Sequence, residues 1–363
     1  MSLNEGQNRA PELDQTRLRL AVDEGILTDA QADRLAEFWP HAGGNRDPLE
    51  INHVDAEEVR FARGFHDVFI TMGIGILLLG LVYGLQSVAS AKIAAFGGAA
   101  AVWVLSEIFA KKMRLALPSF VLTVTFTPMF LVACMLGLSG PDRHGDDVLA
   151  NKDSIALLLP AVVTLAGAAL HYWRFKVPVG LTGVTGAGLF LVALAIDVAS
   201  PGSLERNLVV FALLAGLASF ATAMVFDSRD LQRMTVNSDK AFWLHLMAAP
   251  LLMHSVFQLV TGGNSVEGAG NSILVIGFFL ALAFVAIVVD RRALLVSGLS
   301  YFGFAIASLM NTAEISNEAS FTVTLVLLGC FILLLGSAWR SVRRLLLTPF
   351  ASSALMRFVP AVG

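Results

Sequence analysis

The chain has 363 residues, of which 56% are hydrophobic and only 15% are charged. Its mean hydropathy of +0.72 is far above that of a water-soluble protein, so a lipid bilayer is the expected solvent for most of it. The net charge of -3 and the acidic excess in residues 1–67 exclude a basic face for nucleic acid.

Residues 1–53 predict a small cytoplasmic helical hairpin followed by a linker. Gly25 separates two short helices and ends the first, whereas Thr28 begins the second and Gln31 completes a capping box with it. The composition then turns to Gly, Asn, Asp and Pro, which is typical of a linker. A hairpin of this size cannot hold a core of its own. We therefore expect it to contact the membrane part, a second copy of the chain or a cytoplasmic protein partner.

Residues 54–340 predict an all-α, polytopic transmembrane helical bundle. Asp55 and Glu58 form a second capping box, and the helix that they start leads into the first span. No secretory signal precedes this point, which predicts a cytoplasmic N-terminus. Ten apolar runs follow, each roughly long enough to cross a bilayer core of about 30 Å. They are residues 69–86, 93–109, 117–138, 155–172, 179–196, 208–226, 242–260, 273–289, 293–310 and 321–339.

The boundary between the eighth and ninth runs consists only of Asp290, Arg291 and Arg292. Three adjacent charges at mid-membrane are very costly, so these residues predict a tight turn at the interface. Basic residues concentrate in the connectors after the even-numbered runs and in the tail, which places both termini in the cytoplasm. Residues 341–363 predict a cytoplasmic basic amphipathic tail on the inner leaflet, with simple positive-inside anchoring as the alternative.

Three segments carry a family resemblance: LAVDEGILTDAQADRL at residues 20–35, DKAFWLHLMAAP at 239–250 and DRRALLVSGL at 290–299. They resemble uncharacterised bacterial predicted multi-pass membrane proteins that have a short N-terminal helical domain of unknown function. The resemblance implies a location in the bacterial cytoplasmic (inner) membrane. It implies no substrate, activity or cofactor.

The seventh run carries the first candidate site. At about 100° per residue, Met247, His254 and Gln258 share one stripe of the helix, and Pro250 predicts a kink. A helix that begins at residue 242 places His254 deep in the bilayer and His245 near the interface, on nearly the opposite face. His254 and Gln258 then need partners on other helices. The functional interpretation is a transport or sensing role, and the structural alternative is an interhelical hydrogen bond.

A second candidate is a polar ring at the inner mouth of the bundle. Each connector after an even-numbered run places an ionisable residue near the end of one helix and a basic residue after it. The ring comprises Glu107, His171, Asp227, Asp230, His245 and Asp290. The alternative is a set of local caps and pairs, such as Glu107 with Lys111 one helical turn away.

No motif for catalysis, nucleotide binding, metal or cofactor occurs, so we expect a protein that is not an enzyme and needs no cofactor. Ten spans with both ends inside suit a carrier of a small solute or ion built from two inverted five-helix halves. The halves do not match in sequence, because Pro128 in the third run has no counterpart in the eighth and Pro250 in the seventh has none in the second. The alternative function is a non-transporting membrane sensor or scaffold whose acidic N-terminal module recruits a partner.

Overall fold

The computed structural model describes residues 22–25, 27–34, 65–138, 154–262, 268–313, 315–350 and 360. The chain divides into two units, Met1–Glu58 and Val59–Gly363, and each is described by itself. Every regular element in the described residues is helical.

The described part of the first unit contains the predicted glycine that ends the first short helix and the predicted capping box that begins the second. Gly25 has a φ of +70°, a conformation that glycine adopts at little cost, and its N–H donates to the carbonyl of Val22 at 2.9 Å. The side-chain oxygen of Gln31 accepts from the backbone N–H of Thr28 at 2.9 Å and from the Thr28 hydroxyl at 3.0 Å. The rest of the predicted hairpin, its linker and the capping box of Asp55 with Glu58 lie outside the described residues.

The second unit confirms the predicted number of spans, because its described residues form ten helices long and apolar enough to cross a membrane. They are α3 (Phe65–Val88), α4 (Ala91–Ser106) with its π-helical extension η1 (Glu107–Lys112), α5 (Ala116–Leu138), α7 (Ser154–Phe175), α8 (Gly180–Ala199), α10 (Leu208–Ser228), α11 (Val236–Thr261), α12 (Ala269–Val289), the 3₁₀ turn η2 (Arg292–Leu295) with α13 (Gly298–Thr312), and α14 (Asn317–Ser337). The described residues of this unit also form three short helices: α9 (Ser203–Arg206), α15 (Trp339–Leu347) and η3 (Thr348–Phe350).

Helix α11 begins earlier than the apolar pattern predicts. Its first residue is Val236 rather than residue 242, because the hydroxyl of Thr235 accepts the N–H of Asn237 at 3.2 Å and caps the helix. The first turns of α11 are therefore polar and lie before the apolar run. The earlier start places His245 further along the helix than its position in the apolar run indicates.

The tight turn between the eighth and ninth spans is also confirmed. Asp290 adopts a φ of 61°, and its N–H donates to the carbonyl of Ile287 at 3.2 Å. The N–H of Arg291 donates to the carbonyl of Ala286 at 2.8 Å, which completes a Schellman motif with Asp290 in the position that glycine usually holds. The same left-handed conformation occurs at Arg114, Lys176 and Arg233, one in each of the other three connectors at this end of the bundle. We call this end the connector end.

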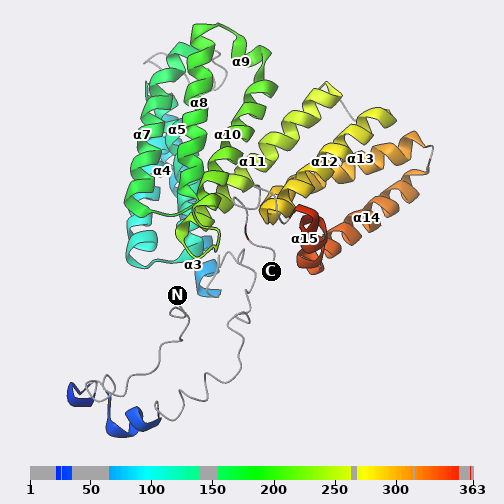
Figure 1. Ribbon diagram of the computed structural model, residues 1–363. Helices are drawn as coiled ribbons and strands as arrows, with labels where there is room; N and C mark the ends of the chain where they lie inside the picture. The colour runs from blue at the N-terminus through cyan, green and yellow to red at the C-terminus, as the bar shows by residue number, and fades with distance from the viewer. Residues whose placement is uncertain are drawn as a thin grey trace, which may run out of the picture. The chain divides into compact units, whose positions relative to one another are not determined.

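The helices form a repeat. In the first repeat (α4, α5, α7 and α8) α5 packs against the other three helices, and in the second repeat (α10, α11, α12 and α13) α11 does the same. Helix α3 packs on α4 and α5 in the first repeat, and α8 packs on α10 and α11 in the second. Helix α8 therefore belongs to the first repeat and also takes the place of α3 in the second. Figure 1 shows α10 and α11 between the helices of the first repeat and α12 to α14. Because the repeats are four spans apart, they run in the same direction, unlike inverted halves.

Burial supports this equivalence, because the same positions of paired helices are buried in one constant register per pair. The buried pairs are Ala95/Gly216, Gly98/Ser219, Val102/Ala223 and Ser106/Asp227 in α4/α10; Ser119/Ala241, Leu122/Leu244, Thr123/His245, Phe126/Ala248 and Ala133/Ser255 in α5/α11; Leu157/Val275, Ala161/Phe279, Thr164/Leu282, Ala168/Ala286 and His171/Val289 in α7/α12; and Gly180/Gly298 and Ala187/Ala305 in α8/α13. Each helix of the first repeat therefore buries the same face as its counterpart in the second repeat.

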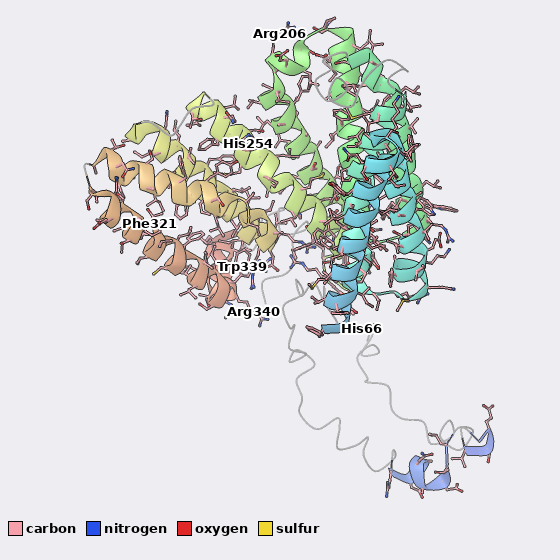
Figure 2. All side chains as sticks on the ribbon, turned by 180° about the vertical axis from the view of Figure 1, so that it is seen from behind. His66, Arg206, His254, Phe321, Trp339 and Arg340 are labelled. Atoms are coloured by element: carbon pink, nitrogen blue, oxygen red, sulfur yellow. The ribbon has the colours of Figure 1, made fainter. Side chains whose placement is uncertain are left out.

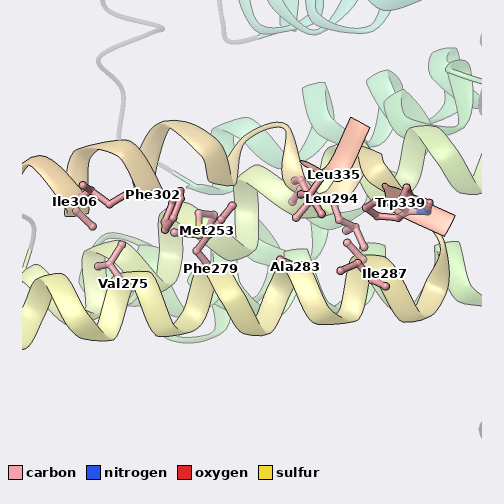
Figure 3. Packing of buried hydrophobic residues seen from close by; sticks show 14 residues of the cluster. Met253, Val275, Phe279, Ala283, Ile287, Leu294, Phe302, Ile306, Leu335 and Trp339 are labelled. Atoms are coloured by element: carbon pink, nitrogen blue, oxygen red, sulfur yellow. The ribbon is translucent and has the colours of Figure 1, made fainter. Parts of the chain in front are cut away.

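The two repeats differ in how their interiors are filled. The largest hydrophobic cluster lies in the second repeat, where Phe279 stacks on Phe302 with ring centroids 4.5 Å apart. Figure 3 shows Met253 of α11 beside these two rings. Trp339, the first residue of α15, extends this cluster to the connector end. One face of α15 is thus buried, as the amphipathic pattern of the tail predicts, with Arg340 and Arg344 on its exposed face.

Candidate functional site

A cavity of about 270 Å³ lies inside the first repeat, between α5, α7 and α8. Its polar side chains are threonines, and none of the described residues that line it is charged. The threonines are Thr123 and Thr127 from α5, Thr164 from α7 and Thr182 from α8. The remaining wall is built from aliphatic side chains, glycines, proline and Phe190. The cavity therefore suits a guest that is largely apolar and has a hydrogen-bonding group.

Helix α5 lacks one backbone hydrogen bond where it lines the cavity. Pro128 lies inside the helix and has no N–H, so the carbonyl of Val124 has no helical donor, and both residues line the cavity. On α8, Gly183 allows a close approach, because a Cβ atom there would lie 2.5 Å from the Thr127 hydroxyl. Backbone irregularity of this kind is tolerated at membrane depth where it faces protein or a cavity.

The hydroxyl of Thr123 is a buried polar group of the wall that has no hydrogen-bond partner among the described residues. Thr164 donates to the carbonyl of Pro160 at 2.7 Å, and Thr182 donates to that of Val179 at 2.6 Å. The side chain of Thr123 is only 4% exposed, and its hydroxyl oxygen has no hydrogen-bond partner among the described residues. A buried hydroxyl left unpaired costs about 1–3 kcal/mol, so a guest with a donor or acceptor gains by binding there.

The second repeat has no room at the equivalent place. The counterpart of Ala161 in the cavity wall is Phe279, which is fully buried and stacks on Phe302. A Cβ atom added at Gly298 would lie 2.7 Å from the Phe279 ring, so glycine is needed where α13 begins. One aromatic ring thus fills the volume that stays open in the first repeat.

The second repeat has instead a buried cluster of charged residues at the connector end. Asp227 of α10 contacts Nε2 of His245 of α11 at 2.8 Å and accepts hydrogen bonds from the Arg291 guanidinium, whose Nε lies 3.2 Å away. Arg291 also donates to the backbone oxygen of Ser238 at 3.2 Å and to its hydroxyl at 3.1 Å. His245 is fully buried, and Arg291 is 1% exposed. The cluster ties α10, α11 and the α12–α13 turn together through buried hydrogen bonds.

Asp290 lies next to this cluster and carries a second set of contacts. Its carboxylate pairs with Arg233 at 3.1 Å and accepts from the Trp339 indole N–H at 2.6 Å. Arg343 of α15 approaches it at 3.9 Å and donates to the carbonyl of Ile287 at 3.2 Å. Burial lowers the pKa of Arg343 and Asp290 opposes that shift, but an arginine stays protonated at neutral pH. These contacts fix the tail helix to the turn between α12 and α13.

Asp230 serves the start of α11. Its carboxylate accepts from the backbone N–H of Thr235 at 2.9 Å, from the Thr235 hydroxyl at 2.6 Å and from the N–H of Met234 at 3.1 Å. Burial raises the pKa of this carboxyl, but the hydrogen bonds together outweigh it and lower the pKa below its ordinary value. Asp230 is therefore part of a cap.

Glu107 and His171 belong to the first repeat. Glu107 forms a two-pronged ion pair with Arg174 of α7, with both N–O distances at 2.9 Å, so its partner is not Lys111 one turn away. His171 is buried, lies 3.4 Å from the hydroxyl of Ser106 and stacks on Phe126. Glu107 and His171 therefore have separate partners in the first repeat. In the second repeat Asp227 contacts His245, whereas Asp290 has its own partners and Asp230 is part of a cap, so these contacts do not join the six residues into one ring.

The two histidines of α11 differ in burial, and the depth expected for each in the bilayer stays a prediction. His254 is exposed at the side of the bundle, where its Nδ1 lies 2.7 Å from the Tyr301 hydroxyl of α13 and its Nε2 lies 3.3 Å from the Gln258 amide (Figure 2). The interhelical hydrogen bond expected of His254 is therefore present. Met247 of the same stripe is half-buried. His245, expected near water, is fully buried because α10 and the α12–α13 turn cover it.

Sequence reasoning missed Arg291 and Thr123. Arg291 is one of three adjacent charges, and only the turn geometry shows that its side chain points inward. Thr123 has a signal in the sequence, the spacing Phe-x-Leu-x₅-Pro, which occurs at Phe120, Leu122 and Pro128 and again at Phe242, Leu244 and Pro250. This spacing aligns the third span with the seventh and places Thr123 opposite His245.

The described residues form ten helices that are long and apolar enough to cross a bilayer. The chain is therefore a multi-pass α-helical membrane protein, with a cavity between three of its helices. Comparison with known proteins gives no further assignment: no protein-family model, curated protein or solved structure matches the chain.

Proposed function

We propose that the protein is a carrier of a small, uncharged, amphiphilic solute, which binds in the cavity of the first repeat. The observation that carries the proposal is the buried, unpartnered Thr123 hydroxyl in an otherwise mostly apolar wall. A charged solute has no counter-ion among the described residues of this wall, and a charge without a partner is very costly within a membrane. An uncharged molecule that pairs with one hydroxyl avoids that cost.

Two further features support a carrier. Pro128 and Pro250 lie inside equivalent helices of the two repeats, and prolines at corresponding positions of two repeats are a sequence pointer to the substrate sites of carriers. The repeats run in the same direction, as in carriers whose halves are related by an axis along the membrane normal. These features are an architectural analogy, whereas the cavity supplies the site argument.

Binding is tested with a photoactivatable alcohol, a diazirine-bearing octanol, on the purified full-length protein. We expect light-dependent labels on peptides of α5 and α8 that line the cavity. Ala161→Phe introduces the ring that closes the second repeat, and it should abolish these labels. Ala169→Phe is the matched control, because Ala169 lies on the exposed face of the same helix. Labels spread evenly over the exposed faces, and unchanged by Ala161→Phe, would contradict the site.

Transport is tested in proteoliposomes with three radiolabelled uncharged amides that have an apolar part, namely nicotinamide, benzamide and butyramide. At least one should enter faster than into protein-free vesicles, and Ala161→Phe should remove that difference while Ala169→Phe keeps it. Protein that labels in the cavity but passes none of the three solutes would reduce the proposal to binding. Absence of both labelling and uptake would contradict it.

We also propose the bacterial cytoplasmic membrane as the location, with both termini in the cytoplasm. Reporter fusions after Arg233 and Arg344 should be cytoplasmic, and fusions after Asp147 and Glu267 should be external. A recruitment role for residues 1–53 is the alternative function, and removing residues 1–50 tests it. Loss of a bound partner or of an oligomer with the bundle intact would support recruitment.

A further inference from the structure

We propose that His245 is a proton-binding site that controls the solute cavity, so that the carrier is coupled to protons. The proposal rests on the proposed function and adds the coupling ion to it. The cavity residue Thr123 and His245 occupy equivalent buried positions of α5 and α11. The first repeat thus holds the solute and the second repeat holds the proton.

The geometry of the cluster leaves one nitrogen of His245 available. Asp227 accepts from the Arg291 guanidinium and is therefore a carboxylate, so Nε2 of His245 carries the hydrogen that it donates at 2.8 Å. Nδ1 then has a lone pair, is buried and has no partner among the described residues. A histidine that is only a structural element usually has both nitrogens hydrogen-bonded, so the free Nδ1 points to a position that takes up a proton.

Charged groups face the imidazole from several elements. Asp227 comes from α10, Arg233 from the α10–α11 connector, and Arg291 from the α12–α13 turn. Asp230 contacts the start of α11, and Asp239 of α11 is exposed and interacts with Arg291. Asp290 follows α12 and is paired with Arg233. In the neutral-histidine state the buried carboxylate of Asp227 is matched by the one charge of Arg291. The cluster is then balanced.

Protonation of Nδ1 adds one positive charge to this balanced cluster. The imidazolium and the Arg291 guanidinium then share a single buried carboxylate, and the two cations repel each other in a dry site. Separation of Arg291 from His245 relieves the repulsion and moves α11 relative to the α12–α13 turn. Release of the proton from Nδ1 restores the original pairing, so the cycle is balanced in charge and atoms.

A direct contact carries this movement to the cavity. Trp243, two residues before His245, stacks on Phe120 of α5 with ring centroids 4.9 Å apart. Phe120 lies one helical turn before Thr123 on the same helix. Helix α11 also packs against α8, which forms another wall of the cavity. A shift of α11 therefore reaches two of the three helices around the solute.

The proton site is tested without any solute by histidine nitrogen NMR on the full-length protein in nanodiscs. His245→Gln assigns the signal, and glutamine keeps an N–H donor for Asp227 so that the fold is retained. We expect Nδ1 of His245 to change from unprotonated to protonated as the pH is lowered within the range in which the protein stays folded, because burial and Arg291 both oppose the added charge. A signal that stays neutral over this range would overturn the proton site, whatever the result for the cavity.

Coupling is tested by photolabelling the cavity with diazirine-bearing octanol across the same pH range. The yield on α5 and α8 should change several-fold with pH in the natural protein and should become independent of pH in His245→Gln. His254→Gln is the matched control, because it lies on the same helix outside the cluster, and it should keep the pH dependence. Labels that appear at every pH with equal yield, while His245 titrates, would overturn the coupling and leave the carrier proposal standing. Absence of labels at every pH would overturn the carrier proposal and the coupling together, even with a titrating His245.

Discussion

The two repeats bury the same helical faces and differ at a few positions within them. Glycine and alanine recur where helices meet, as at Gly180/Gly298 and Ala168/Ala286, and these small residues permit the close approach that both repeats need. The differences concern volume and charge: Ala161 becomes Phe279, and Thr123 becomes His245. The comparison teaches that small buried residues maintain the architecture, while a few large or polar replacements on the same faces give each repeat its own properties.

The same contrast applies to the ion pairs at the connector end. The side chains of Arg174 and Glu107 in the first repeat are each 33% exposed, whereas those of Arg291 and Asp227 in the second are 1% and 6% exposed. An ion pair that water can reach contributes little, but a buried pair is costly to break because one charge stays behind.

The largest expected effect therefore comes from breaking the buried pair. Arg291→Met should lower the free energy of unfolding by about 3–5 kcal/mol, because Asp227 loses its counter-charge. The matched change in the first repeat, Arg174→Met, should cost less than about 1 kcal/mol. Reversible unfolding in mixed micelles measures both. Equal losses at the two sites would mean that burial does not separate the pairs.

Exchanging the side chains at the equivalent positions 161 and 279 should change stability by different amounts in the two repeats. Phe279→Ala removes a ring from a filled core and should cost about 3–5 kcal/mol. Ala161→Phe places a ring next to an existing cavity and should change stability by no more than about 1.5 kcal/mol. The same micelle assay checks this pair. A severe loss in Ala161→Phe would show that the cavity cannot accept a ring.

Replacing the buried His245 of α11 should cost more stability than replacing the exposed His254. His245→Leu leaves the Asp227 carboxylate with one fewer donor in a dry site and should cost about 2 kcal/mol. His254→Leu removes one interhelical hydrogen bond at the side of the bundle, which is worth about 1 kcal/mol. Thermal unfolding of both variants ranks them. A larger loss in His254→Leu would restore the order expected from their positions in the apolar run.

A smaller effect of opposite sign is expected at Thr123. Thr123→Val replaces an unpartnered hydroxyl by a methyl group of similar shape, so it should stabilise the unliganded protein by about 1 kcal/mol. The same change should weaken labelling of the cavity by the photoactivatable alcohol, because the guest loses its hydrogen bond. Stability measured with and without the alcohol separates the two effects. Lower stability without the alcohol would show that the hydroxyl has a structural partner.

Asp230→Asn should give the smallest effect, a loss of about 1 kcal/mol near neutral pH, as for other helix caps. The pKa of this carboxyl is lower in the folded protein than in the unfolded chain, so ionised Asp230 stabilises the fold above the unfolded pKa of about 3.9. That contribution fades as the pH falls through the lower, folded pKa. Unfolding of both proteins as a function of pH should therefore show two curves that converge in acid. Curves that stay parallel would contradict this role.

The sequence was sufficient for the spans, because twenty apolar residues in a row have few alternatives to a membrane helix. The turn at Asp290 and the stop at Gly25 were also predictable, since each follows from local backbone chemistry. The interior of the bundle was not. Depth along a helix says nothing about which neighbour covers a side chain, and His245 is buried by α10 and by a turn more than forty residues away in sequence.

The repeat is hidden from the sequence for a related reason. An inverted arrangement pairs the third span with the eighth and the second with the seventh, so Pro128 and Pro250 have no counterparts in it. The structure pairs the third span with the seventh, which places the two prolines in equivalent helices. The cavity was beyond reach of the sequence, because it results from small differences in volume between facing side chains. Only the unusual number of threonines and glycines in α5 and α8 gives a hint of it.

The most direct test of the account exchanges the two interiors. In the double variant Ala161→Phe with Phe279→Ala, the ring closes the first repeat and leaves a space in the second, where an apolar cavity binds an apolar guest. We predict that labelling by the diazirine-bearing octanol moves from peptides of α5 and α8 to peptides of α11 and α13. Labelling that stays on α5 and α8 in the folded double variant would contradict the equivalence of the repeats and the assignment of the solute site.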